Sequence, residues 1–319
     1  MKGTIVVTRD NIGAIISHVA VKGRLEPESF EDGAKLARLM RAYRDAVRAM
    51  LNHVWAGSKP EEAVRRLYNI IPNYVYLDTA YKQAKLIAES IRRAESETGE
   101  RILASIERVW LSSRGNRWDG GNRNVKLIPG DRWFTMLIKY PWDGSWIRAR
   151  AYFGSKYIPL LKELVELSSR RADGYGATIT LKNGRLAVHV SVPVALYLKH
   201  LGGAKGRGYG LVAGFDLNSD RVNMVVLDGE GSIVAMRTEH FPEVASPGYP
   251  RDKARERRLQ SLAKLLEYAA GIGVDYVAFE NLLKVKRKTK RVKSRKGNRK
   301  MARFAKRELL IHGILASLR

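Results

Sequence analysis

The chain of 319 residues contains no cysteine, which excludes disulfides and thiolate metal sites. No apolar run reaches the roughly 18 residues that a membrane span requires, and the run near the N-terminus is shorter than a signal-peptide core of about 7–15 residues. Glutamine is limited to Gln83 and Gln260, while charged residues make up 28% of the chain. Together these features predict a cytoplasmic protein of thermophilic origin with no membrane partner.

Acidic residues are also scarce relative to basic ones. The chain has 58 Lys and Arg against 32 Asp and Glu, so its formal net charge is +26 and its pI is about 10.3. Such a charge attracts polyanions, and nucleic acid is the partner that it favours.

More than half of this charge lies between Asn281 and Arg319, where 15 basic residues face one acid. The tract is either a solvated loop or a phosphate-contacting segment, and we favour phosphate contact because like charges packed this closely repel without counter-charges. The predicted contacts are Lys284, Lys286, Arg287, Lys288, Lys290, Arg291, Lys293, Arg295, Lys296, Arg299 and Lys300.

Length and apolar content of 45% indicate a globular protein with two domains. Residues 1–200 are expected to form a mixed unit that starts with two short strands within residues 3–24. Helical spacing then predicts helices over 31–55, from Pro60, and over about 80–109, with Thr98-Gly99 as a candidate break. Strands are expected over 125–129, 132–140 and 146–153, then a helix over 158–167 and a hairpin with Asn183-Gly184 at its tip. Residues 201–210 are rich in Gly and Lys and are predicted to be a linker.

Five of the six tryptophans lie between Trp110 and Trp146, among several arginines. Aromatic side chains among basic ones can stack on unpaired bases, but most of these tryptophans are expected to lie in the core. Trp118 is the exception. It lies in a loop of Gly, Asn and Arg with no evident core face, and we predict that it contacts nucleic acid.

Residues 211–319 read as strands over 211–217, 222–227 and from 232, a helix over 255–270, and a strand over 274–282. A hairpin meander, a helical crossover and a returning strand follow the order of a ribonuclease-H-like sheet, in which the first and last of these strands are parallel. Asp216 and Glu280 lie near the carboxyl ends of those two strands. The order therefore predicts two neighbouring carboxylates, which a Mg²⁺ ion would hold together.

The segments GFDLNSDRVNMVVLD, DYVAFENL and RFAKRELLIHGILASLR resemble the first RuvC segments of the TnpB family, the OrfB-type proteins of IS200/IS605 transposons related to Cas12 nucleases. The resemblance implies a mixed α+β and α/β fold. An N-terminal β-barrel wedge over 1–200 would carry an inserted helical recognition block, with helices at about 30–110. A ribonuclease-H-like RuvC domain lacking its last part would occupy 211–319. It further implies an RNA-guided endonuclease that uses guide RNA, target DNA and Mg²⁺ (or Mn²⁺), with Asp216 and Glu280 as the catalytic and metal-binding acids.

The chain departs from that family pattern in two respects. It lacks the third RuvC aspartate and the four-cysteine zinc ribbon, so no zinc is expected, and the apolar face of the last helix is expected to be partly uncovered. The only acid after Glu280 is Glu308, whose neighbours Lys306 and Arg307 favour a local salt bridge over a metal-ligand role.

Several interpretations stay open. The chain is a truncated or partial nuclease, a nuclease-dead RNA- and DNA-binding descendant, or a structural RNA-binding protein. An actin-like ATPase is disfavoured because the Asp216 hairpin turn has no glycine and no P-loop motif occurs.

Overall fold

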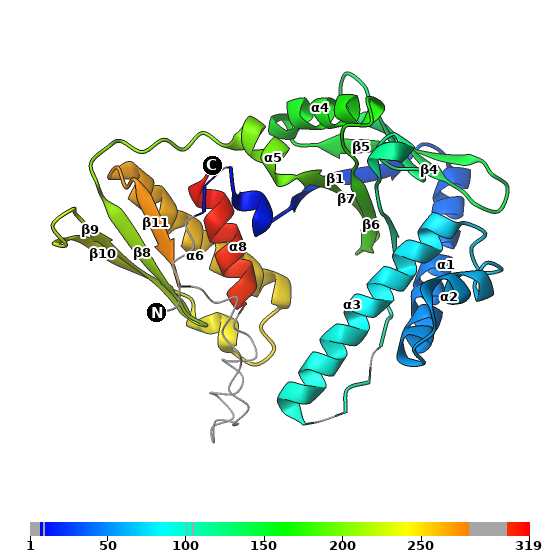
Figure 1. The fold of residues 1–319 in the computed structure, drawn as a ribbon, viewed down its shortest axis with the longest axis horizontal. Helices are drawn as coiled ribbons and strands as arrows, with labels where there is room; N and C mark the ends of the chain where they lie inside the picture. The colour runs from blue at the N-terminus through cyan, green and yellow to red at the C-terminus, as the bar shows by residue number, and fades with distance from the viewer. Residues whose placement is uncertain (1–6, 9, 100, 104, 281–304) are drawn as a thin grey trace. The chain divides into compact units, whose positions relative to one another are not determined.

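The computed structural model describes residues 7–319 except 9, 100, 104 and 281–304 (Figure 1). It divides into two compact units, and the division falls between His200 and Leu201. The first unit is Gly13–His200. The second contains the described residues from Leu201 onward, together with those before Gly13.

The first unit is built on a seven-stranded antiparallel sheet. Its strands are β1 (His18–Pro27), β2 (Trp110–Ser113), β3 (Val125–Pro129), β4 (Phe134–Lys139), β5 (Trp146–Phe153), β6 (Gly176–Lys182) and β7 (Arg185–Pro193). Their order is β2-β6-β7-β1-β5-β4-β3. Within the described residues the end strands β2 and β3 do not pair, so the expected β-barrel wedge is seen as a curled, open half-barrel sheet.

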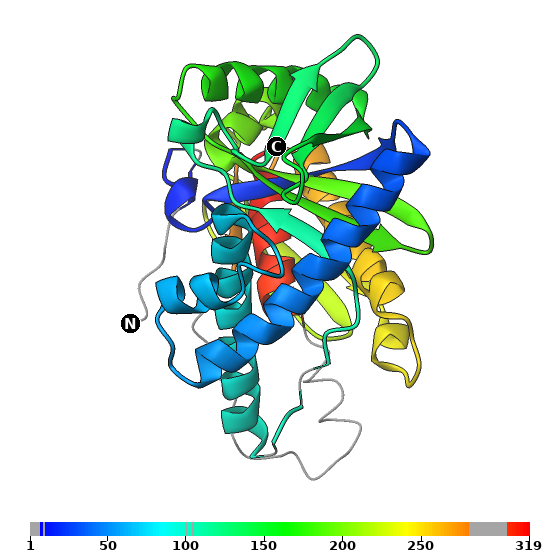
Figure 2. The same cartoon turned by 90° about the vertical axis from the view of Figure 1, so that its right-hand side faces the viewer.

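Five helices accompany this sheet: α1 (Phe30–Trp55), α2 (Pro60–Arg66), α3 (Tyr74–Thr98), α4 (Ile158–Ser169) and α5 (Val194–Leu201). The side chain of Ser29 accepts a hydrogen bond from the Asp32 N–H at 3.0 Å and caps the start of α1. Figures 1 and 2 show α1 and α3 side by side, and alanines at 80, 84 and 88 give α3 a smooth face that is fully buried.

The structure corrects several predicted boundaries in this unit. Gly99 adopts a left-handed conformation (φ 70°) and ends α3 at Thr98, so the helix stops at the candidate break and does not continue to residue 109. Residues 12–14 form a 3₁₀ turn, and the strand starts only at His18. The other strand expected near the N-terminus lies mostly outside the described residues. Two elements were missed, namely β2 and α5, and α5 includes His200.

The second unit contains a four-stranded sheet and two α-helices among its described residues. Its elements are β8 (Val212–Leu217), β9 (Arg221–Leu227), β10 (Ile233–His240), α6 (Arg251–Gly271), β11 (Tyr276–Phe279) and α8 (Lys306–Ser317). The strand order is β10-β9-β8-β11, with antiparallel pairs except for β11 and β8, which are parallel. The predicted parallel pairing of the first and last strands is confirmed.

Both helices pack on the same face of this sheet. α6 contacts β9 and β10, while α8 contacts β8, β11 and α6. Leu309, Leu310 and Ile314 are therefore buried, whereas Leu315 is half-buried, so most of the apolar face that we expected to be partly uncovered is covered.

Asp275, just before β11, ties the predicted linker to the second unit. Its carboxylate accepts hydrogen bonds from the backbone N–H groups of Gly208 (2.8 Å) and Gly210 (2.7 Å), and these bonds lower the pKa of Asp275. The end of the linker is thus held in place before β8 begins. No described helix combines the length and apolarity needed to cross a bilayer.

Candidate carboxylate site and nucleic-acid interface

One row of side chains crosses the four-stranded sheet. Thr238 of β10 is paired with Asn223 of β9, and Asn223 is paired with Asp216 of β8. On the other side of β8, Phe215 is paired with Phe279 of β11, so Glu280 follows β11 at the level of Asp216. Neighbouring strands lie about 4.8 Å apart, so the register brings the two predicted acids to adjacent positions.

These four side chains share the face of the sheet that α6 and α8 leave open. Successive residues of a strand point to opposite faces. Phe215 and Leu217 are buried under the helices, whereas Asp216 between them is exposed, as are Thr238 and Glu280. The two carboxylates are therefore accessible to solvent.

The Asp216 carboxylate is held by amide groups. The Nδ2 groups of Asn218 and Asn223 donate to the same oxygen, Oδ2, at 2.7 and 2.9 Å. The Thr238 hydroxyl in turn donates to Oδ1 of Asn223 at 3.0 Å. Asn218, Asn223 and Thr238 were not predicted as site residues, because a polar residue on the open side of a strand carries no distinctive signal in the sequence.

The donor set is compatible with a magnesium ion. Mg²⁺ in nucleotide-processing sites is commonly bound by one or two carboxylates, with water and phosphate oxygens completing its shell. Asp216 and Glu280 would supply two such oxygen ligands. The described part of the chain contains no group of three or more His, Cys, Asp or Glu placed to hold a metal, so the remaining ligands would come from solvent and substrate.

Glu308 has a different environment. It lies in the first turn of α8, on the helix-covered side of the sheet, where it is paired with Arg255 and Arg258 of α6. Glu308 thus links the two helices, and the Lys306 side chain of the expected local salt bridge lies outside the described residues. Nearby, burial and the charge of Arg255 lower the pKa of His312.

The strongly basic tract over 284–300, with all eleven of its predicted phosphate contacts, lies outside the described residues. The structure therefore gives no geometry for this part of the predicted interface.

Trp118 lies on a hydrogen-bonded loop of the first unit. It is 62% exposed within a 3₁₀ turn, where Asn116 caps the Trp118 N–H and the guanidinium of Arg117 lies 4.7 Å from the centre of its ring. Behind the turn, the fully buried side chain of Asn122 donates to the carbonyls of Ser113 and Tyr175. An exposed tryptophan on an anchored loop has the properties of a stacking platform.

Two other tryptophans flank the open face of the seven-stranded sheet. Arg150 lies 5.0 Å from the ring centre of Trp133, and Lys139 lies 4.9 Å from that of Trp146. Of the five tryptophans in residues 110–146, Trp118 and Trp146 are exposed and the other three are half-buried. Trp110 lies 6.0 Å from the fully buried ring of Tyr43, so the core location expected for most of them holds only in part. The alternation in residues 146–153 is a sequence signal for the exposed position of Trp146. Ile147, Ala149 and Ala151 face the core, so Trp146 and the two arginines at the alternate positions face outward.

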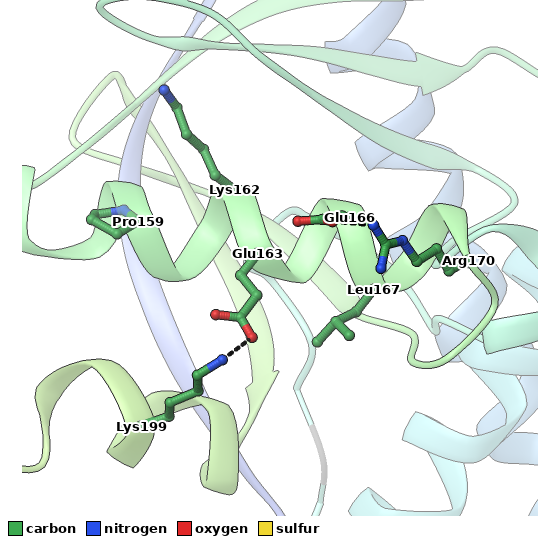
Figure 3. Close-up of a pocket in the computed structure, with 7 residues that line it drawn as sticks. All are labelled: Pro159, Lys162, Glu163, Glu166, Leu167, Arg170 and Lys199. Atoms are coloured by element: carbon green, nitrogen blue, oxygen red, sulfur yellow. Dashed lines mark hydrogen bonds and ion pairs between the residues drawn. The ribbon is translucent and has the colours of Figure 1, made fainter.

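A pocket between α4 and α5 offers a third cluster of charges (Figure 3). Glu163 is bonded to Lys199 at 2.6 Å and to His200 at 2.7 Å, and both partners lower the pKa of the carboxyl. Glu166 is paired with Arg170 at the other end. Because its acids are already neutralised by neighbouring bases, this pocket is best explained as the junction of the two helices.

Relatives of the chain are found among archaeal proteins. Uncharacterized protein SSO2105 of Saccharolobus solfataricus is 46% identical over 290 residues, which cover 91% of this chain and 78% of that protein. An uncharacterized protein of Aeropyrum pernix is 27% identical over 227 residues, covering 68% of this chain and 59% of its own length.

Among solved structures, the Cas12i1 R-loop complex after target DNA cleavage overlaps 67% of this chain and 30% of the solved chain, with a TM-score of 0.21 and 8% identity. That similarity is too low to carry an argument about fold or function. The family model of the SSO2105 N-terminal domain matches residues 18–202. On that match and on the 46% identity, the chain belongs to the SSO2105 family.

Proposed function

We propose that this protein binds RNA and DNA and cleaves DNA phosphodiesters with a divalent cation held on Asp216 and Glu280, as TnpB-type RNA-guided nucleases do. The observation that carries the proposal is the parallel register of β8 and β11, which sets these two acids side by side on an open sheet face. A net charge of +26 supports a polyanionic partner.

The roles of the residues follow from their chemistry. Asp216 and Glu280 would hold the cation, which when bound would supply activation of water and stabilisation of charge on the phosphate. Arg221, which begins β9, has a side chain that is 43% exposed and is paired with Asp220 at 3.5 Å, and it would exchange that partner for a phosphate. The basic tract over 284–300 contacts the nucleic-acid backbone, and Trp118 stacks on an unpaired base.

A second candidate is a nuclease-dead protein that still binds RNA and DNA. It is favoured by the count of acids, because two carboxylates without a third bind metal more weakly than a complete site. A structural RNA-binding protein is the remaining alternative, and it does not account for the paired acids.

The deciding experiment is cleavage of labelled DNA by the purified chain with RNA transcribed from its own locus, in Mg²⁺ and in EDTA. Asp216→Ala and Glu280→Gln are the test variants, and Asp131→Ala, in an exposed turn of the first unit, is the matched control. Metal-dependent cutting that both test variants abolish supports the nuclease. RNA-dependent DNA binding without cutting supports the nuclease-dead protein. Salt-sensitive RNA binding alone, unaffected by metal, supports the structural protein.

A further inference from the structure

The hydrogen bonds on Asp216 are unequal between its two oxygens. Both amide donors, from Asn218 and Asn223, reach Oδ2, whereas Oδ1 accepts no hydrogen bond from the described residues. A carboxylate oxygen with two donors has its in-plane lone pairs filled. Oδ1 of Asp216 is therefore the carboxylate oxygen that can bind a cation.

Hydrogen bonds on both sides of the Asn223 amide agree on its orientation. The Asp216 carboxylate can only accept, so the Nδ2 group of Asn223 faces it, and the Thr238 hydroxyl then donates to Oδ1 of Asn223. Thr238, Asn223 and Asp216 occupy directly paired positions on β10, β9 and β8. The strand register thus builds a relay of two hydrogen bonds that ends on the carboxylate.

Burial does not account for this relay. Asp216 and Thr238 are exposed, and the four-residue row lies on the face that the helices leave open. Exposed polar side chains can hydrogen-bond to water, so they do not need one another as partners. The backbone hydrogen bonds already hold the three strands together, so the sheet does not need these side-chain bonds either. Ordered donors behind a metal ligand are, by contrast, the usual way in which proteins aim that ligand.

We propose that Asn223, locked by Thr238 and assisted by Asn218, is a positioning residue that makes Asp216 a one-oxygen ligand through Oδ1. The inference rests on the proposed metal site and names the residues that set its geometry. Its consequence is that loss of the Asn223 amide frees the carboxylate to rotate and weakens cation binding, although Asn223 itself does not touch the cation.

The test is a Mn²⁺ titration of the purified full chain without nucleic acid, followed by water-proton relaxation. The variants are Asn223→Ala, Thr238→Val and the conservative Thr238→Ser. Asp216→Ala defines the site, and Thr135→Val, a strand threonine of the first unit, is the matched control. We expect Asn223→Ala to raise the Mn²⁺ Kd about 10-fold, the lower end of the range for such supporting residues. Thr238→Val should raise the Mn²⁺ Kd by a smaller factor. Thr238→Ser, which keeps the hydroxyl, and the control Thr135→Val should both have the Kd of the wild type.

The outcomes separate the two ideas. If Asp216→Ala weakens Mn²⁺ binding and Asn223→Ala does not, the positioning role is refuted and the metal site stands. If Asp216→Ala binds Mn²⁺ as tightly as the wild type, the metal site itself fails, and the positioning role fails with it. Thermal unfolding of each variant accompanies the titration, and a weaker Kd counts only where the unfolding midpoint is that of the wild type.

Discussion

The rings of Phe215 and Phe279 lie 5.1 Å apart between centroids, with an angle of 32° between their planes. Each is the residue immediately before one of the two acids. On the helix side, Gly313 of α8 comes so close to Phe279 that a Cβ there would lie 2.7 Å from the ring. The alignment of Asp216 with Glu280 therefore depends on a contact buried beneath them.

Replacement of Phe215 with Ala is expected to lower the free energy of unfolding by about 3–5 kcal/mol, because it leaves a cavity under β8 where the ring was 4% exposed. Urea unfolding followed by circular dichroism measures the change. Phe215→Leu should cost less because it keeps most of the volume. A loss below about 1 kcal/mol for the alanine variant would contradict the packing described here.

Glu308→Gln should destabilise the protein without affecting metal binding. The change removes the carboxylate that links α8 to Arg255 and Arg258 of α6, and hydrogen bonds to charged groups contribute about 1.5–3 kcal/mol. Unfolding in urea should show that loss, while the Mn²⁺ Kd should equal that of the wild type. A large rise in the Kd would instead make Glu308 a ligand.

Stability at alkaline pH should depend on Tyr175. Burial raises the pKa of its phenol to about 12, against about 10 in the unfolded chain. A pKa raised by folding stabilises the protein fully below pH 10, and this contribution is lost as the pH rises from about 10 to 12. Unfolding midpoints measured across that range should fall less steeply for Tyr175→Phe than for the wild type.

The same variant should be less stable at pH 7. The backbone N–H of Leu127 donates to the Tyr175 hydroxyl at 3.0 Å in a buried position, and phenylalanine leaves that donor without this acceptor at a cost of about 1–3 kcal/mol. Equal slopes above pH 10 for both proteins would show that Tyr175 does not titrate as its burial requires.

Trp118→Ala should weaken binding to single-stranded RNA by about 5- to 150-fold, the equivalent of about 1–3 kcal/mol for one stacked base. Stability should not change, because the ring is 62% exposed. Fluorescence anisotropy with a labelled oligonucleotide measures the affinity. Trp55→Ala, which removes another exposed tryptophan, is the control, and equal effects of the two substitutions would refute a specific role for Trp118.

Elements governed by local chemistry could be predicted from the sequence. The helix from residue 30 to Trp55 follows from the helical spacing of its apolar residues. The Asn183-Gly184 turn follows from two residues that accept positive φ, which is 50° at Asn183 and 71° at Gly184. The pairing of β8 with β11 followed from the order of elements alone. It brought together Asp216 and Glu280, which are 64 positions apart.

Features that depend on distant packing could not be predicted. Whether α8 is covered depends on α6, about 50 residues earlier in the chain, and the partners of Glu308 lie on that helix. The Asn223 relay depends on a register among three strands, and a shift of one residue would turn Asn223 to the other face. No pattern in the sequence specifies that register to one residue.

The strand β10 is the edge of its sheet among the described strands, and it exposes Ile233 (62%), Val234 (50%) and Met236 (65%). An apolar edge of this kind can pair with the same edge of another copy and start aggregation. The register shift between Ile233 and Ala235 interrupts the ladder at that point, and Arg237 and Glu239 place charges on the rest of the strand. The strand thus has its own protection against self-association, and the short segment from Ile233 to Met236 is where a solubilising substitution would be most effective.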